Sequence, residues 1–187
     1  MKTQKKIIVL EGPSGVGKDT IIRELIKQNP NIEKIVSYTT RSMRSCDVDG
    51  VTYNFTDTDT FLKKLKTGDI FEHTTRHGTY RGMSKTLINK IINNNKIAIK
   101  DCDAIGLHAL ETAYPNQVVS IFITASKRAV KKRLLGRKDV DIKARLKDYK
   151  SKLGEKNEYD YIVKNNKLEK TIKKIKHIME KKHGTTI

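Results

Sequence analysis

Residues 5–28 read KKIIVLEGPSGVGKDTIIRELIKQ, and this stretch predicts the core of the fold. Its first part, KKIIVL, is a short apolar run rich in β-branched residues, which is typical of a buried strand. After the glycines, apolar residues recur at helical spacing: Ile21, Ile22, Leu25 and Ile26. A strand, a glycine-rich loop and a helix in this order form the setting of a phosphate-binding loop.

The loop, EGPSGVGKDT (11–20), follows the pattern G-x-x-x-x-G-K-[ST] except at its last position, where Asp19 stands. Glycines let backbone N–H groups converge on phosphate oxygens at the positive end of the next helix. Lys18 adds a point charge suited to the β- and γ-phosphates of ATP. The residues predicted to form this phosphate-binding loop are Gly12, Pro13, Ser14, Gly15, Val16, Gly17, Lys18, Asp19 and Thr20.

Asp19 has two interpretations. An acidic residue in the first turn of a helix is favoured by the helix dipole, whatever the function. An aspartate oxygen is also a good ligand for Mg²⁺, and Thr20 still supplies a hydroxyl one residue later. We expect the loop to be altered but working, with Mg²⁺ as the cofactor that accompanies ATP.

The rest of the chain repeats the alternation of strand and helix. Further strands are predicted at 97–101, 118–123 and 161–164, and further helices at 105–112, 126–136 and the C-terminal end. Such repetition predicts an α/β fold, a parallel sheet of the P-loop NTPase type flanked by helices.

One region breaks this rhythm. Residues 37–83 are rich in Thr, Gly, Tyr and Arg, with turn signals at Asp49-Gly50 and His77-Gly78. We therefore expect a small mixed, β-containing insert on the parallel core.

The composition narrows the class of partner. The chain has 187 residues, with 39 Lys+Arg against 21 Asp+Glu, a formal net charge of +18. This excess indicates an anionic partner, either nucleic acid or phosphorylated small molecules. Aromatic residues make up only 6%, and no basic stripe with interleaved aromatics occurs, so a nucleic-acid binder is disfavoured. Many lysines fall on the polar side of helical patterns, where they need no partner.

Location is predicted from what the sequence lacks. No apolar stretch is long enough to span a membrane, and the start does not resemble a signal peptide. Cys46 and Cys102 are far apart and lack metal-ligand spacing, so we expect inert thiols in a reducing cytoplasm.

The insert carries a second group of polar residues. Arg41 and Arg44 are three residues apart and suit a phosphate, because guanidinium donors match its geometry. Ser37 and Tyr53 offer neutral donors beside them. Glu72 could accept paired hydrogen bonds from a base with adjacent N–H groups, as guanine has. Taken alone, each of these arginines and Glu72 is better interpreted as an ordinary surface residue.

Together, these segments resemble the guanylate kinase family over nearly the whole chain. GPSGVGKDT is similar to the family's phosphate loop, SYTTRSMRSCDVDGVTYNF to its segment for the GMP phosphate, and FEHTTRHGTYRG to the segment with its guanine-reading glutamate. Three further segments resemble its strand-end motif, its arginine-bearing lid and the stretch before its last helix: DCDAIG (101–106), KRLLGRKDVDIKARL (132–146) and YDYIVKNNKL (159–168).

The resemblance implies an organisation and a reaction. It implies a single domain, 1–187, in which an NMP-binding insert (37–83) and a short lid (133–146) are carried by a core of 1–36, 84–132 and 147–187. The activity implied is magnesium-assisted phosphorylation of GMP and dGMP by ATP, in a protein that is a monomer or a homodimer and binds neither nucleic acid nor membrane. Phosphoryl transfer needs alignment and charge neutralisation rather than a strong protein base, so we predict none.

The resemblance also implies roles for individual residues. GMP would be bound by Ser37, Arg41, Arg44, Tyr53, Glu72, Arg81 and Asp101. The residues closest to the transferring group would be Lys18, Arg41, Arg133, Arg137 and Arg145. Lys18 and the loop amides would hold the ATP phosphates, and Asn165 would contact adenine. The candidate metal ligands, Asp19 and Asp103, are predicted from the affinity of carboxylates for Mg²⁺ and not from the resemblance.

Departures from the family pattern leave alternatives open. Besides Asp19, Arg81 stands where a tyrosine is common, Met83 where a small hydroxyl residue is usual, and Ile105 where Gln is usual. The related ribose 1,5-bisphosphate kinases share the Lys-Asp loop but lack so similar an insert. Non-catalytic guanylate-kinase-like binding modules typically lose the loop lysine, which is present here as Lys18.

Overall fold

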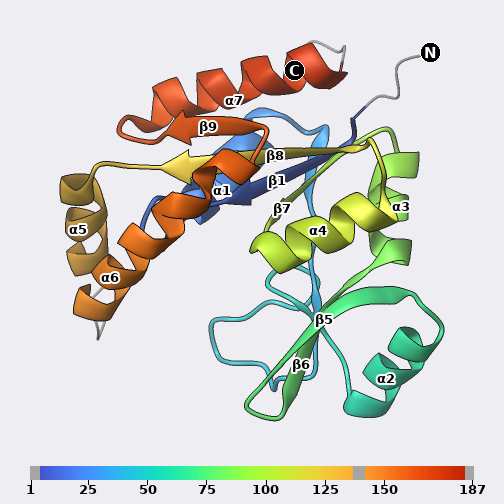
Figure 1. Ribbon diagram of the computed structural model, residues 1–187. Coiled ribbons are helices and arrows are strands. Elements are labelled where there is room, and N and C mark those ends of the chain that lie inside the picture. The colour runs from blue at the N-terminus through green and yellow to red at the C-terminus, as the bar shows by residue number, and fades with distance from the viewer. Residues whose placement is uncertain (1–4, 137–141, 184–187) are drawn as a thin grey trace. The chain divides into compact units, whose positions relative to one another are not determined.

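The computed structural model describes residues 5–136 and 142–183 (Figure 1). The chain forms two compact units, one made of the chain up to Ile32 and from Ile99, the other of Glu33–Ala98. The strands are β1 (Ile7–Glu11), β2 (Ile32–Lys34), β3 (Tyr38–Thr39), β4 (Asn54–Phe55), β5 (Ile70–Arg76), β6 (Thr79–Ser84), β7 (Ile97–Asp101), β8 (Val118–Thr124) and β9 (Tyr161–Lys164). The helices are α1 (Lys18–Gln28), α2 (Thr58–Lys66), α3 (Lys85–Asn93), α4 (Ala104–Ala113), α5 (Lys127–Gly136), α6 (Ile142–Lys152), the 3₁₀ helix η1 (Leu153–Glu158) and α7 (Leu168–His183).

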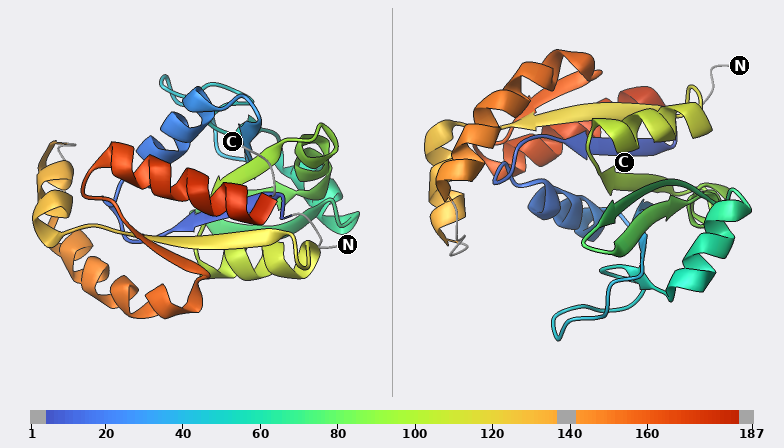
Figure 2. Two further views of the ribbon diagram at one scale, coloured as in Figure 1. Left: turned by 90° about the horizontal axis from the view of Figure 1, so that it is seen from above. Right: turned by 60° about the horizontal axis from the view of Figure 1, so that its bottom comes forward.

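The predicted parallel sheet belongs largely to the first unit, with residues 33–34 of β2 and 97–98 of β7 assigned to the second. The five strands of this sheet follow the order β2-β7-β1-β8-β9, and β8 pairs in parallel with both β1 and β9. All five residues of β1 are buried, as the apolar run predicted, because helices cover both faces of a parallel sheet. Helices α1 and α7 pack together on one face, and α4 and α6 lie on the other (Figure 2). The predicted α/β fold class is confirmed.

The predicted helices agree with the structure to within one or two residues. Helix α1 begins at Lys18 and ends at Gln28, two residues before Pro30. In α7, Ile172, Ile175 and Met179 are buried, so this helix does turn an apolar face to the core. Ile26 of α1 is only half-buried, and the buried face of that helix consists of Ile21, Ile22 and Leu25.

The second unit contains the small mixed sheet. Its strands follow the order β4-β3-β6-β5, with β3 parallel to β4 and antiparallel to β6. The predicted turns are present: His77 and Gly78 have φ of 50° and 71° between β5 and β6, and Gly50 has φ of 73°. Phe61 of α2 is fully buried and stacks on Tyr80 with ring centroids 5.3 Å apart, which fixes α2 to the sheet. The boundaries proposed for core, insert and lid stay predictions.

Candidate active site

The phosphate loop is held in a shape that requires glycine. Gly12 follows the buried strand β1 with φ of 140°, and a Cβ placed there would lie 2.2 Å from the carbonyl oxygen of Ile123. No side chain fits this approach. Gly17, also at positive φ (99°), precedes the first residue of α1, so the loop leads directly into the helix N-terminus. Sheet and helix thus place the loop's N–H groups where an anion is favoured.

Lys18 lies along this loop. Its ammonium donates hydrogen bonds to the carbonyl oxygens of Gly12 and, at 3.4 Å, Pro13. Burial lowers the pKa of Lys18, while the neighbouring charges of Asp101 and Asp19 oppose that shift. The Lys18 ammonium therefore lies near two carboxylates, that of Asp101 at the end of β7 and that of Asp19 in α1.

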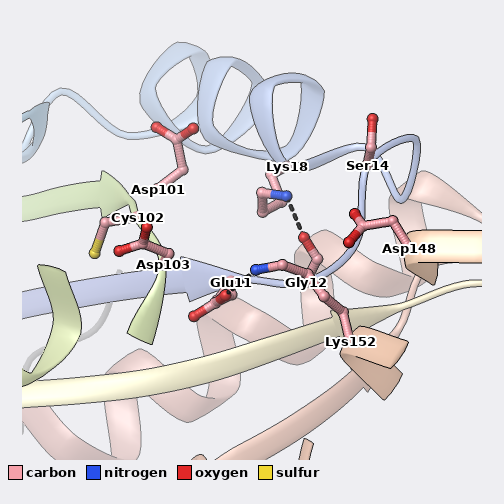
Figure 3. A pocket seen from close by; sticks show the side chains of 9 residues that line it. All are labelled: Glu11, Gly12, Ser14, Lys18, Asp101, Cys102, Asp103, Asp148 and Lys152. Carbon is pink, nitrogen blue, oxygen red and sulfur yellow. Dashed lines mark hydrogen bonds and ion pairs between the residues drawn. The ribbon is translucent and has the colours of Figure 1, made fainter. Parts of the chain in front are cut away.

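Two recesses open beside the loop. The larger has a volume of about 330 Å³ and is lined by Glu11, Gly12, Ser14, Lys18, Asp101, Cys102, Asp103, Asp148 and Lys152 (Figure 3). The smaller, of about 140 Å³, is lined by Ser14, Gly15, Gly17, Lys18, Asp19 and Asp101. Lys18 and Asp101 line both, so the two recesses meet at the loop lysine. Asp19 is exposed and faces the smaller one.

The predicted arginines approach the loop from two helices. Arg133 of α5 donates to the carbonyl oxygens of Val16 (2.9 Å) and Asn165 (2.9 Å), so it braces the outside of the loop. Arg145 of α6 donates to the hydroxyl of Ser14 at 2.6 Å. Arg137 lies outside the described residues. Of the two described arginines, Arg145 is the one whose guanidinium meets a loop side chain that lines both recesses.

Asn165 is buried and supports the phosphate loop through its side chain. It is 2% exposed, its side-chain amide donates to the Val16 carbonyl at 2.8 Å, and its amide oxygen accepts from Thr171 at 3.1 Å. Both ends of the side chain are thus engaged within the protein. Its contact with adenine stays a prediction, whereas its packing against the loop is an additional role that the sequence did not indicate.

The carboxylates at the end of β7 have different settings. Asp101 lines both recesses beside Lys18. Asp103 caps α4, its carboxylate accepting from the Gly106 N–H at 3.1 Å. Among residues 5–136 and 142–183, no group of three or more His, Cys, Asp or Glu side chains gathers as a metal cage. Mg²⁺ in kinases needs only one or two carboxylates besides substrate phosphates and water, so Asp19 in the smaller recess fits such an ion.

Cys102 is half-buried, and its predicted inertness stays a prediction. The thiol lines the larger recess, and burial raises its pKa well above the usual range. Cys46 is exposed, and its inertness stays a prediction.

The second unit gathers a separate cationic cluster. The Arg41 and Arg81 guanidiniums lie 5.6 Å and 5.2 Å from the centroid of the Tyr53 ring. Asp47 accepts a 2.8 Å ion pair from Arg41 and a hydrogen bond from the Arg44 N–H. The Nε of Arg41 is buried without a hydrogen-bond partner, alone in this among the described side chains. A buried donor of this kind indicates an anion-binding position.

Asp47 is a residue that sequence reasoning missed. Its hydrogen bonds to Arg44 and Arg41 lower its carboxyl pKa, so it stays ionised and orients Arg41. The Arg44 side chain itself is exposed. An acidic residue between two arginines and a tyrosine was the available signal.

The guanine-reading candidates lie on the mixed sheet. Ser37, directly before β3, is 8% exposed, and its carbonyl accepts from the Asn54 N–H. Glu72 of β5 is half-buried and pairs in register with Met83 of β6. Met83 is 2% exposed, so the position usually held by a hydroxyl residue carries an apolar side chain facing the interior.

Glu11 and Lys152 were also missed. Glu11 is the last residue of β1 and 2% exposed, and its carboxylate pairs with Lys152 at 2.9 Å and accepts from the Tyr159 hydroxyl. Although burial favours the opposite direction, Glu11 raises the pKa of Lys152. A charged residue ending an otherwise apolar strand was the signal at Glu11, whereas nothing distinguished Lys152 from its neighbours.

Comparison with known proteins agrees with this architecture. The family model described as guanylate kinase matches residues 4–182. The chain belongs to the guanylate kinase family. A guanylate kinase of Maricaulis maris is 32% identical over 177 residues, covering 92% of this chain and 81% of its own. One from Thermotoga maritima is 33% identical, covering 93% and 86%. The crystal structure of guanylate kinase from Anaplasma phagocytophilum superposes with a TM-score of 0.72 at 28% identity, covering 100% of this chain and 90% of that one.

The family resemblance predicted from the motifs is therefore confirmed. The guanylate kinase match spans both units, so it includes the phosphate loop and the Arg41 cluster. In the part of the chain that the structure describes, no helix is both long and apolar enough to cross a membrane.

Proposed function

We propose that this guanylate kinase phosphorylates GMP and dGMP with ATP, forming ADP and GDP or dGDP. An oxygen of the acceptor phosphate forms a bond to the γ-phosphorus as the bond from that phosphorus to the β-γ bridging oxygen breaks. The observation that carries the proposal is Lys18, present on an intact glycine loop and lining both recesses. A non-catalytic module would have no use for this lysine.

The chain's own residues align and neutralise the reacting groups. The loop N–H groups and Lys18 hold the ATP phosphates, and Arg145 is placed to approach the transferring group. Asp19 in the smaller recess would hold the Mg²⁺ that accompanies ATP, which would supply charge neutralisation for the phosphates, while Asp103, the other predicted ligand, lines the larger recess. A phosphate oxygen is already an adequate nucleophile, so no protein base is required.

The acceptor is held by the second unit. Arg41 offers its unpaired Nε to the phosphate of GMP, with Asp47 fixing the guanidinium and Arg44, Tyr53 and Arg81 around it. Asp101 is a further predicted GMP-binding residue. Glu72 and Ser37 would bind guanine. Met83 offers no hydroxyl to the base, and the loss of that one hydrogen bond should lower the affinity for GMP by about 1 kcal/mol.

The insert and the lid are proposed to close over the substrates and exclude water during transfer. We also propose that the protein works in the reducing cytoplasm as a monomer or homodimer, without nucleic acid as a partner. Light scattering on the purified chain, with and without substrates, would measure the oligomeric state.

The deciding experiment measures ADP formation from ATP and Mg²⁺ with GMP, dGMP, AMP, UMP, CMP and ribose 1,5-bisphosphate. We expect rapid turnover with GMP and dGMP alone. Lys18→Ala should lower that turnover about 100-fold or more, whereas Lys27→Ala, an exposed lysine of the same helix, should leave it unchanged. Turnover with ribose 1,5-bisphosphate alone would reject the guanylate assignment, and no turnover with any acceptor would reject the kinase.

A further inference from the structure

A buried carboxylate stands directly before the phosphate loop. Glu11 is 2% exposed, and its two oxygens take different partners: one accepts from the Lys152 ammonium at 2.9 Å, the other from the Tyr159 hydroxyl. The Tyr159 ring packs against the ring of Phe122 in β8, with 5.0 Å between the ring centroids. Glu11 is therefore fixed to the sheet on one side, and its ionic contact is with the last residue of α6.

Helix α6 meets the sheet and the loop along one face. Arg145, Tyr149 and Lys152 are spaced by four and three residues, so their side chains share a face of the helix. Arg145 donates to Ser14 in the loop, the Tyr149 hydroxyl to the Ala125 carbonyl after β8, and Lys152 to Glu11. These three contacts tie this face of α6 to the loop and the sheet, and α6 also packs against α5 and η1.

The contacts differ in strength. Arg145 is an exposed side chain with a hydrogen bond to a hydroxyl, which solvent competes for. In the Glu11–Lys152 pair the carboxylate is 2% exposed and the lysine 30%, so salt screens this pair less than it would a pair of fully exposed groups. Removing the Lys152 ammonium would leave the buried Glu11 carboxylate without a cationic partner, with the Tyr159 hydroxyl as its remaining contact. The Glu11–Lys152 pair is thus the stronger anchor at the far end of the helix.

We infer that Glu11 and Lys152 are positioning residues for phosphoryl transfer, because their ion pair anchors α6 so that Arg145 stands at the phosphate loop. The inference rests on the proposed function. Neither residue needs to touch a substrate. The pair instead links the strand that carries the loop to the helix that carries the arginine (Figure 3).

A merely structural role makes a different prediction. If the pair only offsets a buried charge, removing both charges together should restore whatever each single change loses. If the pair positions Arg145, the neutral double variant should recover stability without recovering the rate. The conservative variant Lys152→Arg keeps the pair and should keep the rate.

The experiment compares kcat, the KM for GMP and the free energy of unfolding in the full chain. Lys152→Met and Glu11→Gln should each lower kcat roughly 10- to 100-fold, with the KM for GMP within about twofold of wild type. The double variant Glu11→Gln/Lys152→Met should unfold like wild type yet keep the low kcat. Lys150→Met removes an exposed charge from the same helix and should match wild type.

A second double-mutant cycle tests whether the loss of kcat in Lys152→Met depends on Arg145. In an Arg145→Ala background, adding Lys152→Met should lower kcat no further, since nothing remains to be positioned. A wild-type kcat in Lys152→Met, a recovered rate in the neutral double variant, or a full additional loss in the Arg145→Ala background would overturn the inference. Absence of GMP turnover in the wild type would instead overturn the proposed function on which it rests.

Discussion

At the scale of single residues, Asp19 is the position where the loop leaves its usual pattern. The carboxylate is exposed in the first turn of α1 and lines the smaller recess with Lys18. Both interpretations survive in this geometry, because the helix dipole favours an acid there and the recess makes it accessible to a metal.

Replacing Asp19 by serine distinguishes the helix-dipole interpretation from the metal-ligand interpretation. If the carboxylate is a ligand, Asp19→Ser should raise the Mg²⁺ concentration for half-maximal activity several-fold, since one charged ligand is lost. Initial rates over a magnesium titration at saturating ATP and GMP would measure this. Asp59→Ser, at an exposed acid in the first turn of α2, is the matched control. An unchanged magnesium profile with a small loss of stability would favour the dipole interpretation.

Single residues were predictable where a motif fixes them. Lys18 was placed by the glycine pattern, and Arg41 by its spacing from Arg44 beside polar neighbours. Glu11 and Lys152 are 141 positions apart in sequence, so their pairing depends on β1 and α6 meeting in the fold. A local pattern cannot contain such information. The same holds for Arg133, whose partners at Val16 and Asn165 lie far from it along the chain.

At the scale of elements, the turn from β1 into the loop depends on Gly12. Gly12→Ala adds a methyl group 2.2 Å from the Ile123 carbonyl oxygen, at φ of 140°. We expect the loop to shift, with about 3 kcal/mol lost from the free energy of unfolding and most activity lost. Gly68→Ala also places alanine at positive φ (74°), but with no atom within 4 Å of the new Cβ. It should cost only about 1 kcal/mol and leave activity intact.

Urea unfolding of the two variants would compare the costs directly. An equal loss of unfolding free energy in both variants would mean that positive φ alone sets the cost. The loop would then have moved away from the Ile123 carbonyl without a further loss of stability. The comparison therefore tests whether the loop is held by contact with β8 or only by its own conformation.

Asp69 lies directly before β5 and accepts hydrogen bonds from residues around the start of α3. Its carboxylate should make the free energy of unfolding depend on pH. Burial alone would raise the pKa of Asp69, but hydrogen bonds from the Thr86 N–H and Ser84 hydroxyl, together with Lys64, lower that pKa to about 2. Because the pKa is depressed in the folded state, the stabilisation is complete above about pH 4 and is lost as pH falls toward 2.

Asp69→Asn should therefore cost at most about 2 kcal/mol at pH 6, and this difference from wild type should shrink steadily between pH 4 and pH 2. Urea unfolding at several pH values would give the difference, with Asp59→Asn, an exposed acid of the same unit, as control. A difference that stays constant down to pH 2 would show that packing, and not the charge of Asp69, is what the substitution removes.

Elements were predicted best where the hydrophobic period is strong. The apolar runs gave β1, β7, β8 and β9 to within about two residues, since buried parallel strands are continuous in hydrophobicity. The short strands β3 and β4 have two residues each, and tertiary pairing rather than local propensity defines them. This is why the insert could be identified as mixed while its strand order could not.

At the scale of the whole molecule, the two proposed phosphate sites account for only part of the net charge of +18. The α7 lysines Lys170, Lys173 and Lys174 are exposed, while its apolar face packs inward. Their field adds to that of the cations at the two sites. ATP and GMP are both anions, so the excess should speed their approach at low salt.

We predict that raising ionic strength from about 0.01 M to 0.1 M, which shortens the Debye length from about 30 Å to about 10 Å, lowers kcat/KM several-fold. The value of kcat should change little, because the bound phosphates are largely shielded from salt. Initial rates with KCl at fixed free Mg²⁺ would measure both.

The control removes distant charge while leaving the sites intact. The variant Lys170→Gln/Lys173→Gln/Lys174→Gln should keep most of the salt dependence if the loop lysine and the Arg41 cluster dominate the approach of the substrates. Loss of the dependence in this variant would instead show that α7 supplies the attraction. The lysine-rich helix would then act in substrate capture, whereas retention of the slope would leave it as a solvated outer face whose charges serve solubility.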